Sequence, residues 1–210
     1  MLRKLHWLGH DAFRIDGPPV VYFDPYTLGE GNPVADIILI SHEHGDHCSP
    51  ADAAKIQGEG TTIVTIAAAA AMLKGDILIV QPGDKLRLKG IEIEAVPAYN
   101  VNKFRSPGVP FHPEEAGHVG FVVTLAGQRI YHAGDSDHIP EMAELGEIDI
   151  ALLPVSGHYV MTADEAGEAA GVIRPTIAIP MHVGRGIGAI TDTEAFRARS
   201  PVEVVVLDIE

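Results

Sequence analysis

The chain has 210 residues, with 15 Lys and Arg against 29 Asp and Glu, which gives a formal net charge of −14 at pH 7. Because an acidic surface repels phosphate backbones, this charge disfavours extended nucleic-acid binding. The hydrophobic share of 46% is typical of globular proteins. No apolar run approaches the ~18 residues of a membrane span. We therefore expect a small-molecule substrate as partner, with no extended nucleic acid and no membrane, and we allow for a homo-oligomer.

Cysteine usage and the first residues bear on the compartment. Cys48 is the single cysteine, so an internal disulfide is excluded. The first ten residues, MLRKLHWLGH, lack the apolar stretch of a signal peptide. These features favour a cytoplasmic protein. The length is most simply that of a single domain over residues 1–210.

Short segments rich in β-branched and apolar residues dominate the chain and predict strands. In chain order they span 12–16, 20–24, 36–41, 61–66, 76–80, 85–88, 91–96, 120–126, 129–134, 148–155, 176–181 and 202–209. Two stretches, 37–40 and 204–207, are continuously apolar, which predicts strands covered on both faces.

Helices are expected between these strands. Ser49 followed by Pro50 predicts a capped helix start. Thr162 and Glu165 have the spacing of a capping box, at the start of a helix over 162–173. Further helices are expected over 67–73, 139–145 and 192–199. Strands that come first in runs and then alternate with helices predict an α/β (α+β) protein with two sheets and the helices outside.

One short segment, SHEHGDH, carries the clearest chemical signal. Four potential metal ligands, His42, His44, Asp46 and His47, follow directly on the apolar stretch 37–40. Imidazole nitrogens and carboxylate oxygens bind zinc and similar ions at about 2.0–2.2 Å. Six residues cannot comfortably wrap four ligands around one ion, but they can serve two adjacent ions.

Two other interpretations of this segment were weighed. The helical HExxH zinc motif would need a histidine at position 46, where this chain has Asp46. Gly45 also argues against a helix, because glycine favours a turn. A solvated histidine-rich loop is the remaining alternative, and the tight spacing of the ligand types disfavours it.

The segment matches the HxHxDH motif of the metallo-β-lactamase superfamily. Further stretches resemble, in the same order, the small stand-alone metal-dependent hydrolases of that superfamily: HWLGHDAFRI, YFDPY, IYHAGDSD, ALLPVSG, MTADEA and IPMHVG. The resemblance covers nearly the whole chain. It implies a four-layer αββα sandwich of two mixed β-sheets, with the metals at one edge between the sheets.

The same resemblance implies metal ligands in this chain. The first ion would be bound by His42 and His44, and the second by Asp46, His47 and His182, with Asp135 bridging both. Each of these segments follows a predicted strand, where a sheet edge can present its side chains.

The third ligand of the first site departs from the family's pattern. The family usually has a histidine in a run such as VPAxH, whereas this chain reads VPAYN and offers Asn100. His112 and His118 follow in the same loop. Three alternatives stay open: His112 supplies the missing ligand, Asn100 contacts the metal or its water, or the first site is weakly occupied.

Such a centre indicates hydrolysis. Two divalent ions about 3.5–4 Å apart can share a water and lower its pKa toward neutrality. We expect a metal-bridged hydroxide to attack a small, anionic ester substrate, a phosphodiester or a lactone. Zinc is the expected metal, with manganese, nickel or iron as alternatives. Catalytic Asp46 could orient the hydroxide or pass a proton to the leaving group.

Two other functions are retained. One is a non-catalytic metal-binding protein, which the departure at Asn100 keeps open. The other is a di-iron oxidoreductase relative. Those proteins carry HxExDH, with a carboxylate at the position of His44, and a flavin domain. Both features argue against that function here.

Cations near the motif suggest an anion pocket. The loop over 100–118 is long and rich in Pro and Gly, and such loops often have a function. It carries Lys103 and Arg105, while Arg185 lies in a Gly-rich stretch after His182. We expect these three cations to bind a phosphate or carboxylate, and His158 to line the same opening. Solvated loop charges are the alternative.

Two further residues are expected to support the ligands. Asp24 is placed behind the metal ligands, where it could hold a ligand histidine in its proper tautomer. His10 has either a similar supporting role or only a structural hydrogen bond at a turn.

Overall fold

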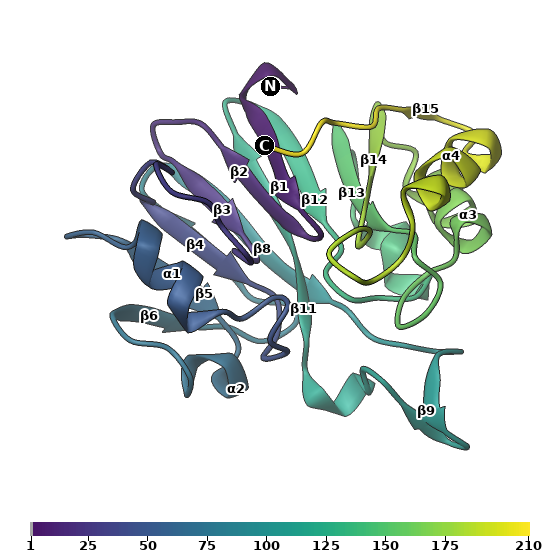
Figure 1. Cartoon of the computed structure of the whole chain (residues 1–210), viewed down its shortest axis with the longest axis horizontal. Coiled ribbons are helices and arrows are strands. Elements are labelled where there is room, and N and C mark those ends of the chain that lie inside the picture. The colour runs from purple at the N-terminus through teal and green to yellow at the C-terminus, as the bar shows by residue number, and fades with distance from the viewer. Residues whose placement is uncertain (1) are drawn as a thin grey trace.

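The computed structural model describes residues 2–210 and consists of two β-sheets with helices on the outside (Figure 1). The first sheet has six strands in chain order: β1 (Leu5–Gly9), β2 (Ala12–Ile15), β3 (Val21–Phe23), β4 (Ile37–Ile40), β5 (Thr62–Thr65) and β6 (Asp76–Ile79). Strands β1 to β3 are antiparallel and β3 to β6 are parallel, so this sheet is mixed.

The second sheet has seven strands in the order β15-β14-β13-β12-β11-β8-β7. They are β7 (Lys85–Leu88), β8 (Ile91–Pro97), β11 (Val119–Leu125), β12 (Gln128–His132), β13 (Ile150–Pro154), β14 (Ile177–Met181) and β15 (Glu203–Val204). Strands β12 to β15 are parallel, and β7, β8, β11 and β12 are antiparallel.

Four α-helices flank the sheets. α1 (Pro50–Ile56) and α2 (Ala67–Ala70) lie beside the first sheet, while α3 (Ala163–Ile173) and α4 (Ile190–Arg199) lie beside the second (Figure 1). Single 3-10 turns occur at Leu2–Lys4, Glu114–Ala116 and Pro140–Glu144. The predicted αββα sandwich of two mixed sheets is confirmed. Among residues 2–210, no helix has the length and apolar character to cross a membrane.

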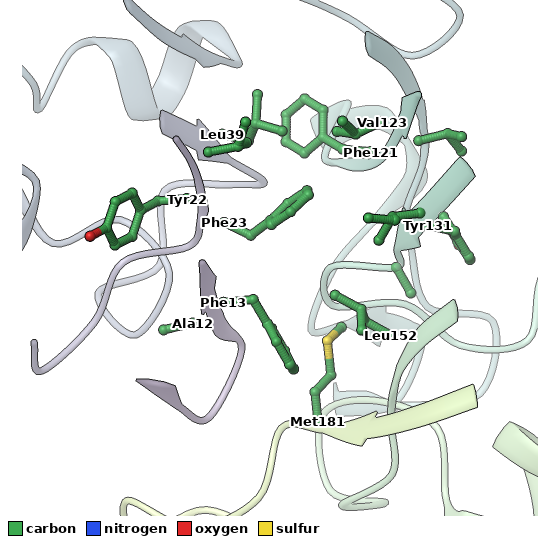
Figure 2. Packing of buried hydrophobic residues seen from close by; sticks show 14 of the residues in the cluster. Ala12, Phe13, Tyr22, Phe23, Leu39, Phe121, Val123, Tyr131, Leu152 and Met181 are labelled. Carbon is green, nitrogen blue, oxygen red and sulfur yellow. The ribbon is translucent and has the colours of Figure 1, made fainter. Parts of the chain in front are cut away.

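Large aromatic side chains fill the space between the sheets. Phe13 and Phe23 from the first sheet point toward Phe121 and Leu152 of the second (Figure 2). All four are almost completely buried. Burying a side chain of this size contributes about 1.5–3 kcal/mol, so this layer holds the two sheets at a fixed distance.

The local predictions for two helix starts are confirmed. The Ser49 hydroxyl accepts a hydrogen bond from the amide of Asp52 at the start of α1. Thr162 and Glu165 form the full capping box of α3. The cause is the same at the start of both helices: a short side chain with an oxygen atom accepts a hydrogen bond from an amide that has no partner within the helix.

Other local predictions need correction. The segment 204–207 is not a covered strand, since β15 ends at Val204 and the residues after it are only half-buried. Helix 67–73 is shorter than expected, and 139–145 is a 3-10 turn. β1 and the small hairpin of β9 (Phe104–Ser106) and β10 (Val109–Pro110) were not predicted.

The segments that carry the predicted ligands meet at one edge of the sandwich. Residues 42–47 follow β4, Asp135 follows β12, and His182 follows β14. β12, β13 and β14 are parallel neighbours. The carboxyl ends of parallel strands lie at one edge of a sheet, so segments far apart in the sequence can converge there.

Candidate metal centre

Three histidines form a first cluster. The Nδ1 of His44 lies 3.0 Å from Nε2 of His42 and 3.1 Å from Nε2 of His112. The three ring nitrogens all lie within 4.8 Å of one another, which is close enough to hold a metal ion. The structure therefore brings His112, from the loop before β11, to the two histidines of the HxH motif.

The orientation of these rings leaves the converging nitrogens free. The Ser41 hydroxyl donates to Asp24 at 2.6 Å, so its oxygen accepts from Nδ1–H of His42 at 2.9 Å. Nδ1 of His112 lies 3.0 Å from the amide oxygen of Asn100, which can only accept. In both rings the Nε2 lone pair is then directed into the cluster.

The side chain of Asn100 is hydrogen-bonded to other residues of the protein. Its Oδ1 also accepts from the backbone amide of His112, and its Nδ2 donates to the carbonyl of Tyr159. The carboxamide is thus used by His112 and Tyr159, an arrangement that suits a residue supporting His112 better than one in contact with the metal or its water. His118 lies outside the three-histidine group, with its Nε2 3.2 Å from Glu43.

A second cluster lies on the other side of Asp135. Oδ1 of Asp135 is 3.2 Å from Nε2 of His47 and 3.3 Å from Nε2 of His182. Its Oδ2 is 3.2 Å from Nε2 of His112 in the first cluster. One carboxylate therefore presents an oxygen to each cluster, as a bridging ligand must.

The second cluster also has its outer nitrogens occupied. Nδ1 of His47 is bonded to Asp24 at 2.8 Å, and Nδ1 of His182 is bonded to Ser156 at 2.8 Å. Asp24 in addition accepts from the amide and the hydroxyl of Ser41, which adjoins His42. Asp24 thus has the position that its expected supporting role requires: it contacts His47 of the second cluster directly and His42 of the first through Ser41.

Several inward-facing atoms are buried without a hydrogen-bond partner. They include Nε2 of His47, Nε2 of His182 and Oδ1 of Asp135. Burying such polar atoms unpaired costs free energy. A cation shared among them would remove this cost, so the residues present fit a metal ion.

The two clusters differ in proton affinity. Burial lowers the pKa of His42 well below its usual value and lowers that of His112 to about 4. Burial also acts on His182, but the carboxylates of Asp135 and Asp11 outweigh it and raise the pKa to about 9. At neutral pH and without an ion, His42 and His112 are therefore neutral and His182 carries a proton.

Asp46 lies at the solvent side of the second cluster. Its Oδ2 is 3.8 Å from Nε2 of His47 and 3.1 Å from Nε2 of His10. Burial opposes ionisation of this carboxyl, but the hydrogen bond from His10 outweighs it and holds the pKa well below its usual value. His10 thus contacts a predicted ligand, and Asp46 is an anion at neutral pH.

A cavity of about 450 Å³ opens over both clusters. It is lined by His44, Gly45, Asp46, Arg105, Phe111, His112, Asp135, Tyr159 and Ile187. Arg105 is the one cation in this lining, and its guanidinium lies 5.7 Å from the centre of the Phe111 ring. Of the expected substrate-binding residues, the structure brings Arg105 to the cavity.

The other expected substrate-binding residues have other contacts in the structure. Lys103 lies 2.7 Å from Glu165 and 3.4 Å from Asp137, so its charge is already neutralised. Arg185 donates to the carbonyl of Leu8. His158 packs its ring against Tyr159. Neither Arg185 nor His158 belongs to the cavity lining.

One group near the second cluster was not predicted as a ligand set. Ligand atoms of His10, Asp11, His47 and His182 all lie within 4.8 Å of one another. For His10 and the adjacent Asp11, the sequence predicts either a supporting role or a structural hydrogen bond at a turn, and no direct contact with an ion. The sequence carries no clear signal here, because a Gly-His-Asp turn is usually exposed.

Comparisons with known proteins identify the family of the chain. A family model described as a beta-lactamase superfamily domain matches residues 4–182. A UPF0173 metal-dependent hydrolase of Thermoplasma acidophilum is 35% identical over 213 residues, which cover 93% of this chain and 89% of the relative.

Solved structures give the same result. A Parabacteroides distasonis protein, 32% identical, has a TM-score of 0.85 and covers 98% of this chain and 93% of its own. A metallo-β-lactamase fold protein of Bacillus subtilis, 13% identical, has a TM-score of 0.69 over 94% of this chain and 88% of its own, and this likeness bears on the fold alone. The chain therefore belongs to the β-lactamase superfamily and, within it, to the UPF0173 metal-dependent hydrolases.

Proposed function

We propose that this chain is a metal-dependent hydrolase with two divalent ions, acting on a small anionic ester such as a phosphodiester or a lactone. The relatives named as metal-dependent hydrolases support the general activity. The observation that carries the proposal is the disposition of Asp135, whose two oxygens face one histidine cluster each.

The residues that would hold the ions follow from the two clusters. His42, His44 and His112 would bind the first ion, and Asp46, His47 and His182 the second, with Asp135 shared. Imidazole ligands suit zinc, so we propose zinc for the first site. Bound ions supply a water of lowered pKa and positive charge beside the reacting group.

The chain's own residues would position the substrate and the water. Asp46 is ionised and lines the cavity, so it can accept a hydrogen bond from a water and orient it toward the substrate. Arg105 at the cavity wall can pair with a phosphate or carboxylate of the substrate. The half-buried side chains of Phe111 and Tyr159 also line the opening.

The test is a panel assay of metal-free and metal-loaded protein. The panel contains bis-p-nitrophenyl phosphate, sugar-phosphate lactones and a β-lactam. We expect hydrolysis of the phosphodiester or a lactone, its loss after chelation and its return when zinc is added back. Tight metal binding with no hydrolysis of any member would contradict the proposal and favour a non-catalytic metal protein. Iron in place of zinc, with no hydrolysis, would favour the oxidoreductase alternative.

A further inference from the structure

The turn between β1 and β2 is buried, which is unusual for a two-residue hairpin turn. His10 and Asp11 form this turn, and both side chains have 0% exposure. Turns normally lie at the surface, because their polar groups need water. His10 also has a φ of +53°, a left-handed backbone conformation that histidine adopts at a cost. A buried, strained and ionisable turn needs a partner that offsets these costs.

The backbone of this turn is held on several sides. The indole of Trp7 donates to the carbonyl of His10 at 2.8 Å. The amide of Gly134 donates to Nδ1 of His132 at 3.2 Å, so Nε2–H of the same ring donates to the carbonyl of Asp11 at 2.9 Å. These contacts use the backbone of the turn and leave the carboxylate of Asp11 directed inward.

That carboxylate has no hydrogen-bond partner among the residues the structure describes. Both of its oxygens are buried and unpaired. Oδ2 lies 3.4 Å from Nε2 of His47 and 3.9 Å from Nε2 of His182. Two atoms bound to one ion at about 2.0–2.2 Å can be no more than about 4.4 Å apart. Asp11 therefore meets the distance condition for sharing an ion with both histidines.

We propose that Asp11 is a further ligand of the second ion and that this added carboxylate shifts the relative affinity of the second site toward manganese. The inference rests on the two-ion centre proposed above. With Asp11, the second site would have carboxylates from Asp11, Asp46 and Asp135 beside two imidazoles. Carboxylate oxygens suit Mn²⁺, whereas imidazole-rich sites suit Zn²⁺. The first cluster, with three imidazoles, suits Zn²⁺.

The experiment compares Mn²⁺ and Zn²⁺ binding to metal-free protein by calorimetry, without any activity assay. The variant is Asp11→Asn, which keeps the shape and removes the charge. The matched control is Asp16→Asn, the same change on the same hairpin, where the carboxylate is exposed and pairs with Arg14. A second variant, Asp11→Ser, shows whether any change in the first variant is caused by the introduced carboxamide rather than by loss of the carboxylate.

We expect both Asp11 variants to lose at least about 10-fold in Mn²⁺ affinity, because even residues that only support a ligand typically contribute 10–100-fold. Zn²⁺ binding to the first site should stay within twofold, and Asp16→Asn should bind both ions like the unaltered protein. The Mn²⁺-induced rise in Tm should shrink in the Asp11 variants.

Mn²⁺ affinity and Tm shifts in both Asp11 variants within twofold of the unaltered protein would overturn the inference while leaving the two-ion centre in place. Failure of the unaltered protein to bind any divalent ion would instead overturn the proposed function, and this inference with it. The two failures are therefore distinguishable in one set of titrations.

Discussion

The two clusters at the sheet edge contain different types of ligand, although only the carboxylate of Asp135 separates them. The first has three imidazoles, from the 42–44 turn and the loop that ends at His112. The second draws on the β1–β2 turn, the end of the 42–47 turn and the residue after β14, and it is richer in carboxylates. The difference teaches that one strand edge can form two unlike coordination environments. Which environment arises depends on which loops reach the edge.

The largest expected effect comes from removing one histidine of each cluster. His112→Ala should abolish the first site and His182→Ala the second, and each should reduce hydrolysis by at least about 100-fold, since supporting residues alone contribute 10–100-fold. Metal content by mass spectrometry should fall from two ions to one in each variant. A His112→Ala protein that kept both ions tightly bound would contradict the role of His112.

Substitution of the residues that support the ligands should have smaller effects on metal affinity, and these effects should differ between the two sites. Asn100 contacts His112 alone among the predicted ligands, whereas Asp24 contacts His47 and, through Ser41, His42. Asn100→Ala should therefore weaken the first site by about 10–100-fold and spare the second. Asp24→Asn should weaken both. Calorimetric titration checks this, and loss of both sites in Asn100→Ala would argue against the assignment.

The pH dependence of metal binding should also differ between the clusters. His182 has a pKa of about 9 without an ion, so below that pH an incoming ion must displace a proton. The pKa of His47 is also raised, because Asp135 and Asp24 outweigh the effect of burial. Affinity at the second site should therefore rise from pH 6 to 9, by up to about 10-fold per pH unit for each proton displaced. His112, with a pKa of about 4, is neutral over this range, so the first site should change little. Competition with a chelator at several pH values measures both slopes, and equal slopes would contradict the distinction.

A feature could be predicted from the sequence where it depends only on residues close together in the chain. Some features depend only on neighbouring residues: the HxHxDH turn, the capped helix start at Ser49 and the capping box at Thr162. The structure contains the turn and both caps where the sequence predicts them. The choice between Asn100 and His112 depends on how a 13-residue stretch of loop folds back, which no local pattern encodes. The burial of Asp11 depends on the packing of the second sheet against the β1–β2 turn, so the sequence alone carries no sign of it.

The pairing of the loop cations and the position of the last apolar stretch also could not be predicted from local sequence. Lys103 and Arg105 are two residues apart and look equivalent in the sequence, but Glu165 and Asp137 pair with Lys103 only. The apolar stretch 204–207 looks like a central strand, but only its first residue belongs to a strand, the short edge strand β15. Both outcomes are set by segments distant in the chain.

The smallest expected effect concerns these two cations. Arg105→Met should raise KM for an anionic ester about two- to fivefold, because an exposed ion pair contributes only about 0.2–1 kcal/mol. Lys103→Met is the matched control and should leave KM within twofold, while lowering Tm because Asp137 loses its buried partner. Steady-state kinetics and thermal unfolding check both, and a KM increase confined to Lys103→Met would reverse the assignment.

The most direct test of the two-ion centre is anomalous diffraction from crystals of the zinc-loaded protein. The account predicts two peaks about 3.5–4 Å apart, one beside His42, His44 and His112 and one beside His47 and His182, with Asp135 between them. A single peak, or ions away from Asp135, would contradict it.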